Sequence, residues 1–118
     1  MRVKGGPRSK NRRKKVLKAT DGFQGRINNT FVAANEALNR ARDFNYRDRK
    51  KFKQRMRQLW ITRITAASRA RGFSYSQLMH ALNQQQITIN RKMLADLAAT
   101  DPESFEAIVK SAGLSASS

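Results

Sequence analysis

The sequence predicts an all-α protein with a short basic N-terminal helix, one long projecting helix and a small C-terminal helical bundle. Residues 26–71 contain neither glycine nor proline, and apolar side chains recur there at helical spacing. Residues that cap helices precede each of the later apolar stretches. Alternation of apolar and polar residues, which indicates strands, is confined to residues 87–89. We therefore expect helices as the only regular elements.

The first twenty residues carry nine cations and no acid, with glycine and proline near their start. We expect an irregular tail followed by a short helix at about residues 9–19. The sizeable apolar residues of that helix are Val16 and Leu17, too few to bury a face against protein. The sequence therefore indicates that this helix binds something other than protein. The two glycines of residues 21–25 predict a turn that acts as a hinge before the next helix.

A single long helix is expected over residues 26–71, because one apolar stripe keeps its phase along the whole stretch. A helix of 46 residues spans about 69 Å, several times what a domain of this size can shelter. Much of the helix must therefore project. The stripe consists of Ile27, Phe31, Ala34, Leu38 and Ala41, and it resumes with Phe52, Met56, Trp60, Ile64 and Ala67.

Three short helices are expected after Gly72, a residue that suits a helix C-terminus. Ser74 and Gln77 have the spacing of a capping box. Asn90 can cap the following helix, and Asp101-Pro102 is a strong start for the last helix, which Gly113 would end.

The buried faces of these helices would close a bundle of about 60 residues with the stripe from Met56 to Ala67, a feasible size for a small domain. We accordingly divide the chain into a basic extension at residues 1–58 and a C-terminal helical domain at residues 59–118. The side chains expected on the buried faces are Tyr75, Leu78, Met79 and Leu82, then Met93, Leu94, Leu97 and Ala98, then Phe105, Ile108 and Val109.

The positive charge is concentrated in one part of the chain. The 118 residues carry a formal net charge of +17, beyond the range of about 2–8 that solubility requires of a small domain. Residues 1–71 hold 22 cations and four acids, whereas residues 72–118 are close to neutral. This asymmetry indicates a polyanionic partner that binds the basic part. The absence of cysteine suits a reducing compartment such as the cytoplasm.

Cations surround the long helix between residues 42 and 57. Pairs such as Asp43 with Arg47 and Asp48 with Lys51 would contribute only about 0.2–0.5 kcal/mol each, and two acids cannot balance eight cations. Phosphates on several sides of the helix explain the pattern better than a solvated charged helix does. That geometry is more typical of structured RNA than of one duplex groove.

The residues that could perform chemistry are few and scattered, so we expect no enzyme, no cofactor and no metal site. His80 is the single histidine, has no cysteine or second histidine to share a metal with, and is expected to be structural. Trp60 could stack on a base, but its place in the apolar stripe favours core packing. Tyr46 lies among cations, where stacking or a phosphate hydrogen bond is as plausible as a plain surface role.

Four segments together resemble the bacterial-type large-subunit ribosomal protein twenty family. The similarity covers nearly the whole chain and extends to Arg2-Val3-Lys4, to Lys14-Lys15 and to Gly22 and Gly25. The segments are Tyr46-Arg47-Asp48-Arg49-Lys50, Arg57-Gln58-Leu59-Trp60-Ile61-Thr62-Arg63-Ile64, Gly72-Phe73-Ser74-Tyr75-Ser76 and Asn90-Arg91-Lys92-Met93-Leu94-Ala95-Asp96-Leu97-Ala98. The resemblance implies a basic helical extension threaded into large-subunit ribosomal RNA and a C-terminal domain on an RNA junction. It also implies neighbouring ribosomal proteins as partners, an early role in subunit assembly and, in some members, repression of the protein's own messenger.

Two segments depart from the family pattern. Residues 27–30 (Ile-Asn-Asn-Thr) lack the basic and aromatic residues usual there, and residues 83–86 (Asn-Gln-Gln-Gln) lack the usual lysines. The RNA-binding residues that we expect are Arg2, Lys4, Arg8, Lys10, Arg12, Arg13, Lys14, Lys15, Lys18, Arg26, Arg42, Tyr46, Arg47, Arg49, Lys50, Lys51, Lys53, Arg55, Arg57, Arg63, Arg69, Arg91 and Lys92.

Other readings predict different partners. A nucleoid-type protein would bind duplex DNA through the same charge excess, and it is the main alternative. The basic, acid-free N-terminus could also be an organellar transit peptide. Binding to a membrane surface would need a broader apolar face than residues 42–57 provide. We expect a ribosomal protein of the bacterial cytoplasm, with a plastid ribosome as the other source, and no small-molecule substrate.

Overall fold

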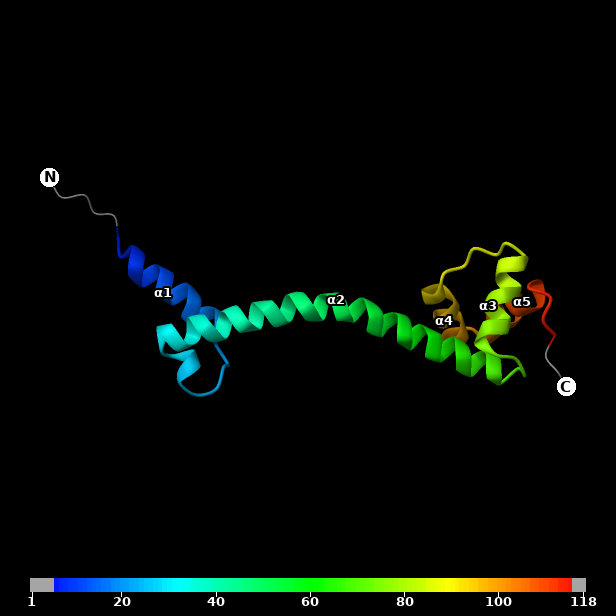
Figure 1. The fold of residues 1–118 in the computed structure, drawn as a ribbon, viewed down its shortest axis with the longest axis horizontal. Coiled ribbons are helices and arrows are strands. Elements are labelled where there is room, and N and C mark those ends of the chain that lie inside the picture. The colour runs from blue at the N-terminus through cyan, green and yellow to red at the C-terminus, as the bar shows by residue number, and fades with distance from the viewer. Residues whose placement is uncertain (1–5, 116–118) are drawn as a thin grey trace. The chain divides into compact units, whose positions relative to one another are not determined.

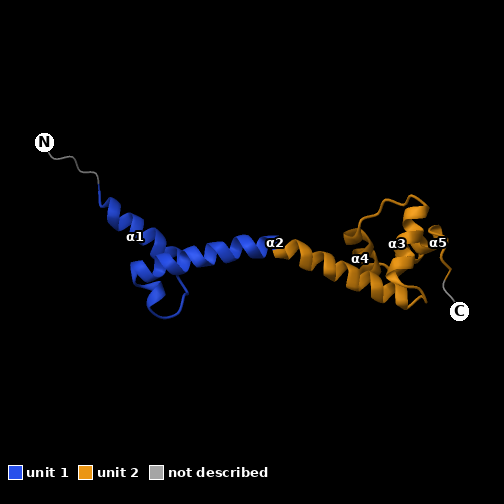
Figure 2. Ribbon diagram, viewed as in Figure 1, with its two compact units in different colours: residues 1–50 blue, residues 51–118 orange. Residues whose placement is uncertain are grey.

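The structure, a computed structural model, describes residues 6–115, and these residues form α-helices, a short 3-10 helix and no strand (Figure 1). The predicted all-α class is therefore confirmed. The chain divides into two compact units, residues 1–50 (unit 1) and residues 51–118 (unit 2), as Figure 2 shows. The predicted division after residue 58 falls within the same helix as this boundary and stays a prediction.

Unit 1 begins with helix α1 (Arg8–Ala19), which follows Pro7 and ends at Thr20. The turn predicted after α1 is present, and Gly22 adopts a φ of +88° there, a conformation that glycine reaches without steric cost. The short 3-10 helix η1 (Gly25–Asn28) comes next.

The long helix α2 (Phe31–Arg69) begins five residues later than the sequence pattern predicts. Residues 26–30 were expected in this helix, but η1 and two following residues occupy that stretch. The reason lies in Asn29 and Thr30, whose short polar side chains compete for backbone hydrogen bonds and favour helix boundaries. The Thr30 carbonyl accepts the amide of Ala34 at 2.8 Å and so starts the α-helical hydrogen bonds.

Unit 1 has few buried side chains among its described residues. Ala34 and Thr20 are fully buried, and Leu38 is 7% exposed. Five apolar residues are half-buried: Val16, Leu17, Phe23, Ile27 and Phe31. In α1 the half-buried residues lie in the last turn, and the other residues of the helix are exposed.

Unit 2 contains the end of α2 and the helices α3 (Tyr75–Gln84), α4 (Arg91–Thr100) and α5 (Pro102–Ser111). Each predicted cap is present. Ser74 and Gln77 form the capping box, Asn90 Oδ1 accepts the amide of Met93 at 2.9 Å, and Asp101 accepts the amide of Ser104 at 3.2 Å. Hydrogen bonds from Ser104 lower the pKa of Asp101 below its ordinary value.

A continuous apolar core fills unit 2, as the sequence predicts. Its buried members are Ile64, Phe73, Leu78, Leu82, Leu94, Ala95, Phe105, Val109 and Ala112. Two expectations about it were wrong. Met93 is 55% exposed and Ala95 is buried instead, because Leu94, Ala95 and Ala98 define the inner face of α4 and Met93 lies on the opposite side. The stripe of α2 reaches the core from Trp60 onward, and Met56 lies before it.

Three helices end in the same hydrogen-bond pattern. One backbone amide donates to the carbonyl five residues earlier, and the preceding amide donates to the carbonyl three residues before it. After α2 these bonds join Phe73 to Ser68 and Gly72 to Arg69. Gly72 has a φ of +90°, which confirms the predicted helix end. After α3 the corresponding position is Gln86, which adopts a φ of 55° without being glycine.

Candidate nucleic-acid interface

Helix α1 presents an uninterrupted cationic surface. The exposed cations are Arg8, Lys10, Arg12, Arg13, Lys14, Lys15 and Lys18, and no acid stands in the helix. The guanidinium of Arg13 lies over the ring of Phe31 at 5.6 Å from the ring centre and so links α1 to the start of α2. Arg26 is exposed in η1. Arg2 and Lys4, also expected to bind RNA, lie outside the described residues.

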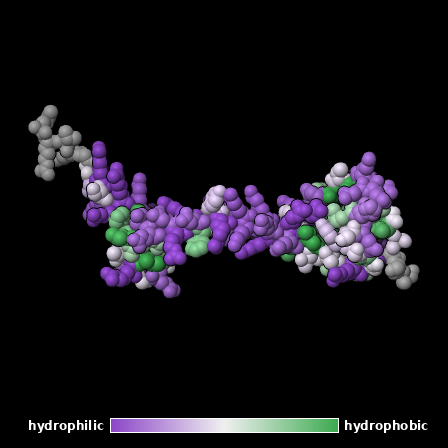
Figure 3. Space-filling view, in the orientation of Figure 1, coloured by the Kyte–Doolittle hydropathy of each residue, from purple (hydrophilic) through white to green (hydrophobic). Residues whose placement is uncertain are grey.

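The middle of α2 is exposed on every side. All residues from 42 to 55 are exposed, which covers nearly four helical turns, and the predicted cations point around the whole circumference. Figure 3 shows hydrophilic side chains over most of the visible face of this stretch. Protein packing therefore does not stabilise this part of the helix, as the sequence predicts.

Ion pairing compensates little of this charge. The pairs Asp43 with Arg47 and Asp48 with Lys51, which a solvated charged helix would use, are absent among residues 6–115. Arg47 instead contacts its neighbour Asp48, with 3.5 Å between Nε and Oδ1. Both side chains are more than half exposed, so the pair contributes little. Most of these cations remain available to an external polyanion.

Two exposed aromatic rings are interleaved with the cations of α2. Arg47 lies over Phe44 at 4.6 Å, and the ammonium of Lys50 lies over Tyr46 at 4.5 Å. Such contacts hold a flexible cation against the helix and reduce the entropy lost when it binds an anion. Tyr46 is 58% exposed, so its ring and hydroxyl are accessible to a partner.

Unit 2 adds a second group of cations, of which two have structural contacts. The exposed members are Lys51, Lys53, Arg55, Arg57, Arg63, Arg69 and Lys92. Arg91 is half-buried, and its Nε donates to the Tyr75 hydroxyl at 2.6 Å, which joins α4 to α3. Arg71, which the sequence prediction left out, donates to the carbonyls of Ala67 and Pro102 and lies over the ring of Phe105 at 5.1 Å. It joins α2 to α5.

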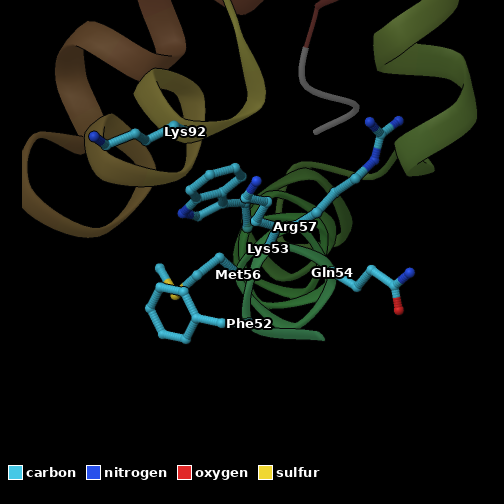
Figure 4. A pocket seen from close by; sticks show the side chains of 7 residues that line it. Phe52, Lys53, Gln54, Met56, Arg57 and Lys92 are labelled. Atoms are coloured by element: carbon cyan, nitrogen blue, oxygen red, sulfur yellow. The ribbon is translucent and has the colours of Figure 1, made fainter. Parts of the chain in front are cut away.

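Sequence reasoning missed a groove on unit 2 beside Trp60. Phe52, Met56 and Trp60, spaced one helical turn apart, line it together with Lys53, Gln54, Arg57 and, from α4, Lys92 (Figure 4). Trp60 is half-buried and packs against the core, which confirms the favoured prediction for it. The groove went unnoticed because the same stripe was assigned entirely to the core, and the sequence does not show how far along α2 the helix α4 reaches.

Within residues 6–115 there is no cluster of three or more potential metal ligands. His80 is exposed on α3. The two carboxylates whose pKa is lowered have local causes: Ser104 beside Asp101, and Lys110 in an ion pair of 2.9 Å with Glu106. No helix of the described region is long and apolar enough to cross a membrane.

Charge, exposure and fold together define a class: a basic helical protein whose exposed cations suit a polyanionic partner. Comparison with known proteins identifies the family. Residues 2–108 match the model of the family described as ribosomal protein L20. The chain therefore belongs to the ribosomal protein L20 family, which is structural and non-enzymatic, and the predicted resemblance is confirmed.

Relatives of high similarity cover nearly the whole chain. The large ribosomal subunit protein bL20 of Geobacter sulfurreducens is 52% identical over 107 residues, which is 91% of this chain and 92% of that relative. The proteins of the same name from Magnetococcus marinus and Acaryochloris marina are 49% and 50% identical, over 94% and 95% of this chain and 95% and 97% of their own lengths. The alternative of a nucleoid-type DNA-binding protein gains no support from these comparisons.

Proposed function

We propose that this chain is a structural constituent of the large ribosomal subunit, in the cytoplasm, and that it binds large-subunit ribosomal RNA through the cations of α1 and α2. The observation that carries the proposal is the fully exposed, cation-rich stretch from residue 42 to 55. A helix of this kind has no protein packing and little ion pairing, so phosphates are the partner that suits it. Family membership names the ribosome as the source of those phosphates.

The mechanism is electrostatic and architectural. RNA helices that converge repel one another through their phosphates, and a cationic helix placed between them removes that repulsion. Arginines add planar, bidentate hydrogen bonds to phosphate oxygens. We assign this role to Arg47, Arg49, Arg55, Arg57 and Arg63, all of which are exposed. The expected site residues that lie in α1 supply further exposed cations.

We further propose a role early in subunit assembly and contact with neighbouring ribosomal proteins. Neutralising phosphates matters most before the RNA helices have packed, because the repulsion must be removed for packing to begin. We do not extend the proposal to repression of the protein's own messenger, because residues 83–86 are exposed but uncharged where the family carries lysines.

The test is a filter-binding titration of the full chain with large-subunit ribosomal RNA at several salt concentrations, with small-subunit ribosomal RNA and duplex DNA as competitors. We expect large-subunit RNA to win the competition at physiological salt. Equal competition by all three polyanions would reduce the protein to a nonspecific basic binder and contradict the proposal. Preference for duplex DNA would instead support the nucleoid alternative.

A further inference from the structure

The groove on unit 2 combines an apolar wall with a cationic rim. Its volume is about 590 Å³, within the range of about 300–1,000 Å³ that is usual for ligand sites. Figure 4 shows the side chains of Phe52 and Met56 together on one side of α2, and Lys92 extending from α4. All the residues that line the groove belong to unit 2, so this unit by itself determines its geometry.

Part of the apolar wall lies outside the core of unit 2. Phe52 is 61% exposed and takes no part in the core or in the layer packed against it. Trp60 differs, because it packs on the core and also lines the groove. The exposed ring of Phe52 and the half-buried side chains of Met56 and Trp60 form a contiguous apolar surface. Such a surface often marks a binding site.

The rim of the groove is cationic. Lys53, Arg57 and Lys92 line the groove itself, and no acid does. Two adjoining depressions share Trp60 and Lys92 and add Arg63 and Arg91, with Asp96 as the one acid lining any of the three. A partner that fills this site must therefore offer a flat apolar surface with negative charge beside it.

Resting on the proposed function, we infer that the groove holds an unpaired nucleobase of the RNA partner. The base stacks against Phe52 and the exposed part of Trp60. The phosphates on either side of that nucleotide contact Lys53, Arg57 and Lys92. A nucleobase has apolar faces and is joined covalently to phosphates on both sides, which matches the wall and the rim together. A base inside a duplex offers no free face, so the site selects a bulged or single-stranded nucleotide.

Trp60 is the only tryptophan of the chain and reports directly on the groove. The experiment titrates the full chain with single-stranded oligoadenylate while recording Trp60 fluorescence. Inorganic polyphosphate of equal phosphate number, which has charge but no bases, is titrated in parallel. We expect oligoadenylate to quench Trp60 and polyphosphate to bind with little quenching. Equal quenching by both would overturn the inference, because charge alone would then explain the signal.

Variants at Phe52 separate stacking from simple apolar contact. Phe52→Leu keeps the apolar volume but loses the ring, and it should weaken oligoadenylate binding about five- to tenfold, the low end of the loss for one stacking aromatic. Phe52→Tyr keeps the ring and should bind like the original chain. The matched control is Val32→Ala, because Val32 is similarly exposed at 65% on the same helix but lines none of these depressions.

The remaining outcomes separate this inference from the proposed function. Undiminished oligoadenylate binding by Phe52→Leu would overturn the stacking role. Reversible self-association that Phe52→Ala abolishes would assign the groove to a second copy of the chain instead. In either case the inference fails, whereas the proposed function survives if the original chain still selects large-subunit ribosomal RNA in the competition experiment. Loss of that selectivity would contradict the proposed function itself.

Discussion

The two units solve the problem of stability in different ways. Within residues 51–115, unit 2 buries nine apolar residues in one core and caps each of its short helices, so apolar burial can account for its fold. Among residues 6–50, unit 1 buries only Thr20, Ala34 and Leu38 and carries most of its charge on exposed cations. Charge repulsion therefore opposes the fold of unit 1, and we expect a polyanion to relieve it. Unit 2 is stabilised by its own core, whereas the exposed cations of unit 1 suit a polyanionic partner.

Removal of residues 1–20 should give the largest change in binding. These residues carry nine cations, and each neutralised phosphate adds roughly 0.7–0.9 to the steepness of the logarithmic salt dependence. We expect weaker binding of large-subunit RNA and a salt slope that falls by up to about 6–8. Filter binding at several salt concentrations measures both. The thermal unfolding of unit 2 should not change, and an unchanged salt slope would contradict the role of α1.

Phe105→Ala should give the largest change in stability. Phe105 is fully buried, and such truncations cost roughly 3–5 kcal/mol, most of the stability expected for a domain of this size. Circular dichroism during heating should show unit 2 melting at a much lower temperature than in the original chain.

Leu38→Ala tests unit 1 by the same kind of truncation. Leu38 is 7% exposed, but we expect residues 1–40 to be disordered without RNA, so thermal unfolding of the free chain should not change. RNA affinity should fall instead, because binding must order the segment in which Leu38 is buried. A shift in the unfolding of the free chain comparable to that of Phe105→Ala would show that unit 1 folds without its partner.

Gln86→Gly should give the smallest change in stability, and it should stabilise unit 2 where Phe105→Ala destabilises it. Gln86 adopts a φ of 55°, which costs a residue with a side chain about 1 kcal/mol relative to glycine. The substitution should raise the melting temperature of unit 2 by about 4–8 °C. Gln85→Gly is the matched control, because Gln85 has a φ of −83° and gains nothing from glycine. Equal effects of the two substitutions would mean that Gln86 is not strained.

Local features of the fold could be predicted from the sequence because they depend on residues close in the chain. The capping box at Ser74 and Gln77, the caps at Asn90 and Asp101, and the helix end at Gly72 are all present. The start of α2 was misplaced because an uninterrupted apolar stripe outweighed the boundary preference of Asn29 and Thr30. The candidate cations could be identified from the positions of lysine and arginine along the chain, and their role in RNA binding is a proposal.

The sequence by itself determined the helical periodicity, the caps and the separation of charge, because each depends on spacing along one chain. Only the tertiary structure distinguished Arg71 and Arg91, which join helices, from the exposed cations around them. The same holds for the burial of Ala95 in place of Met93 and for the groove beside Trp60. These features depend on where one helix meets another. The neighbours of a residue in space decide its role, so two residues of the same type can have different roles.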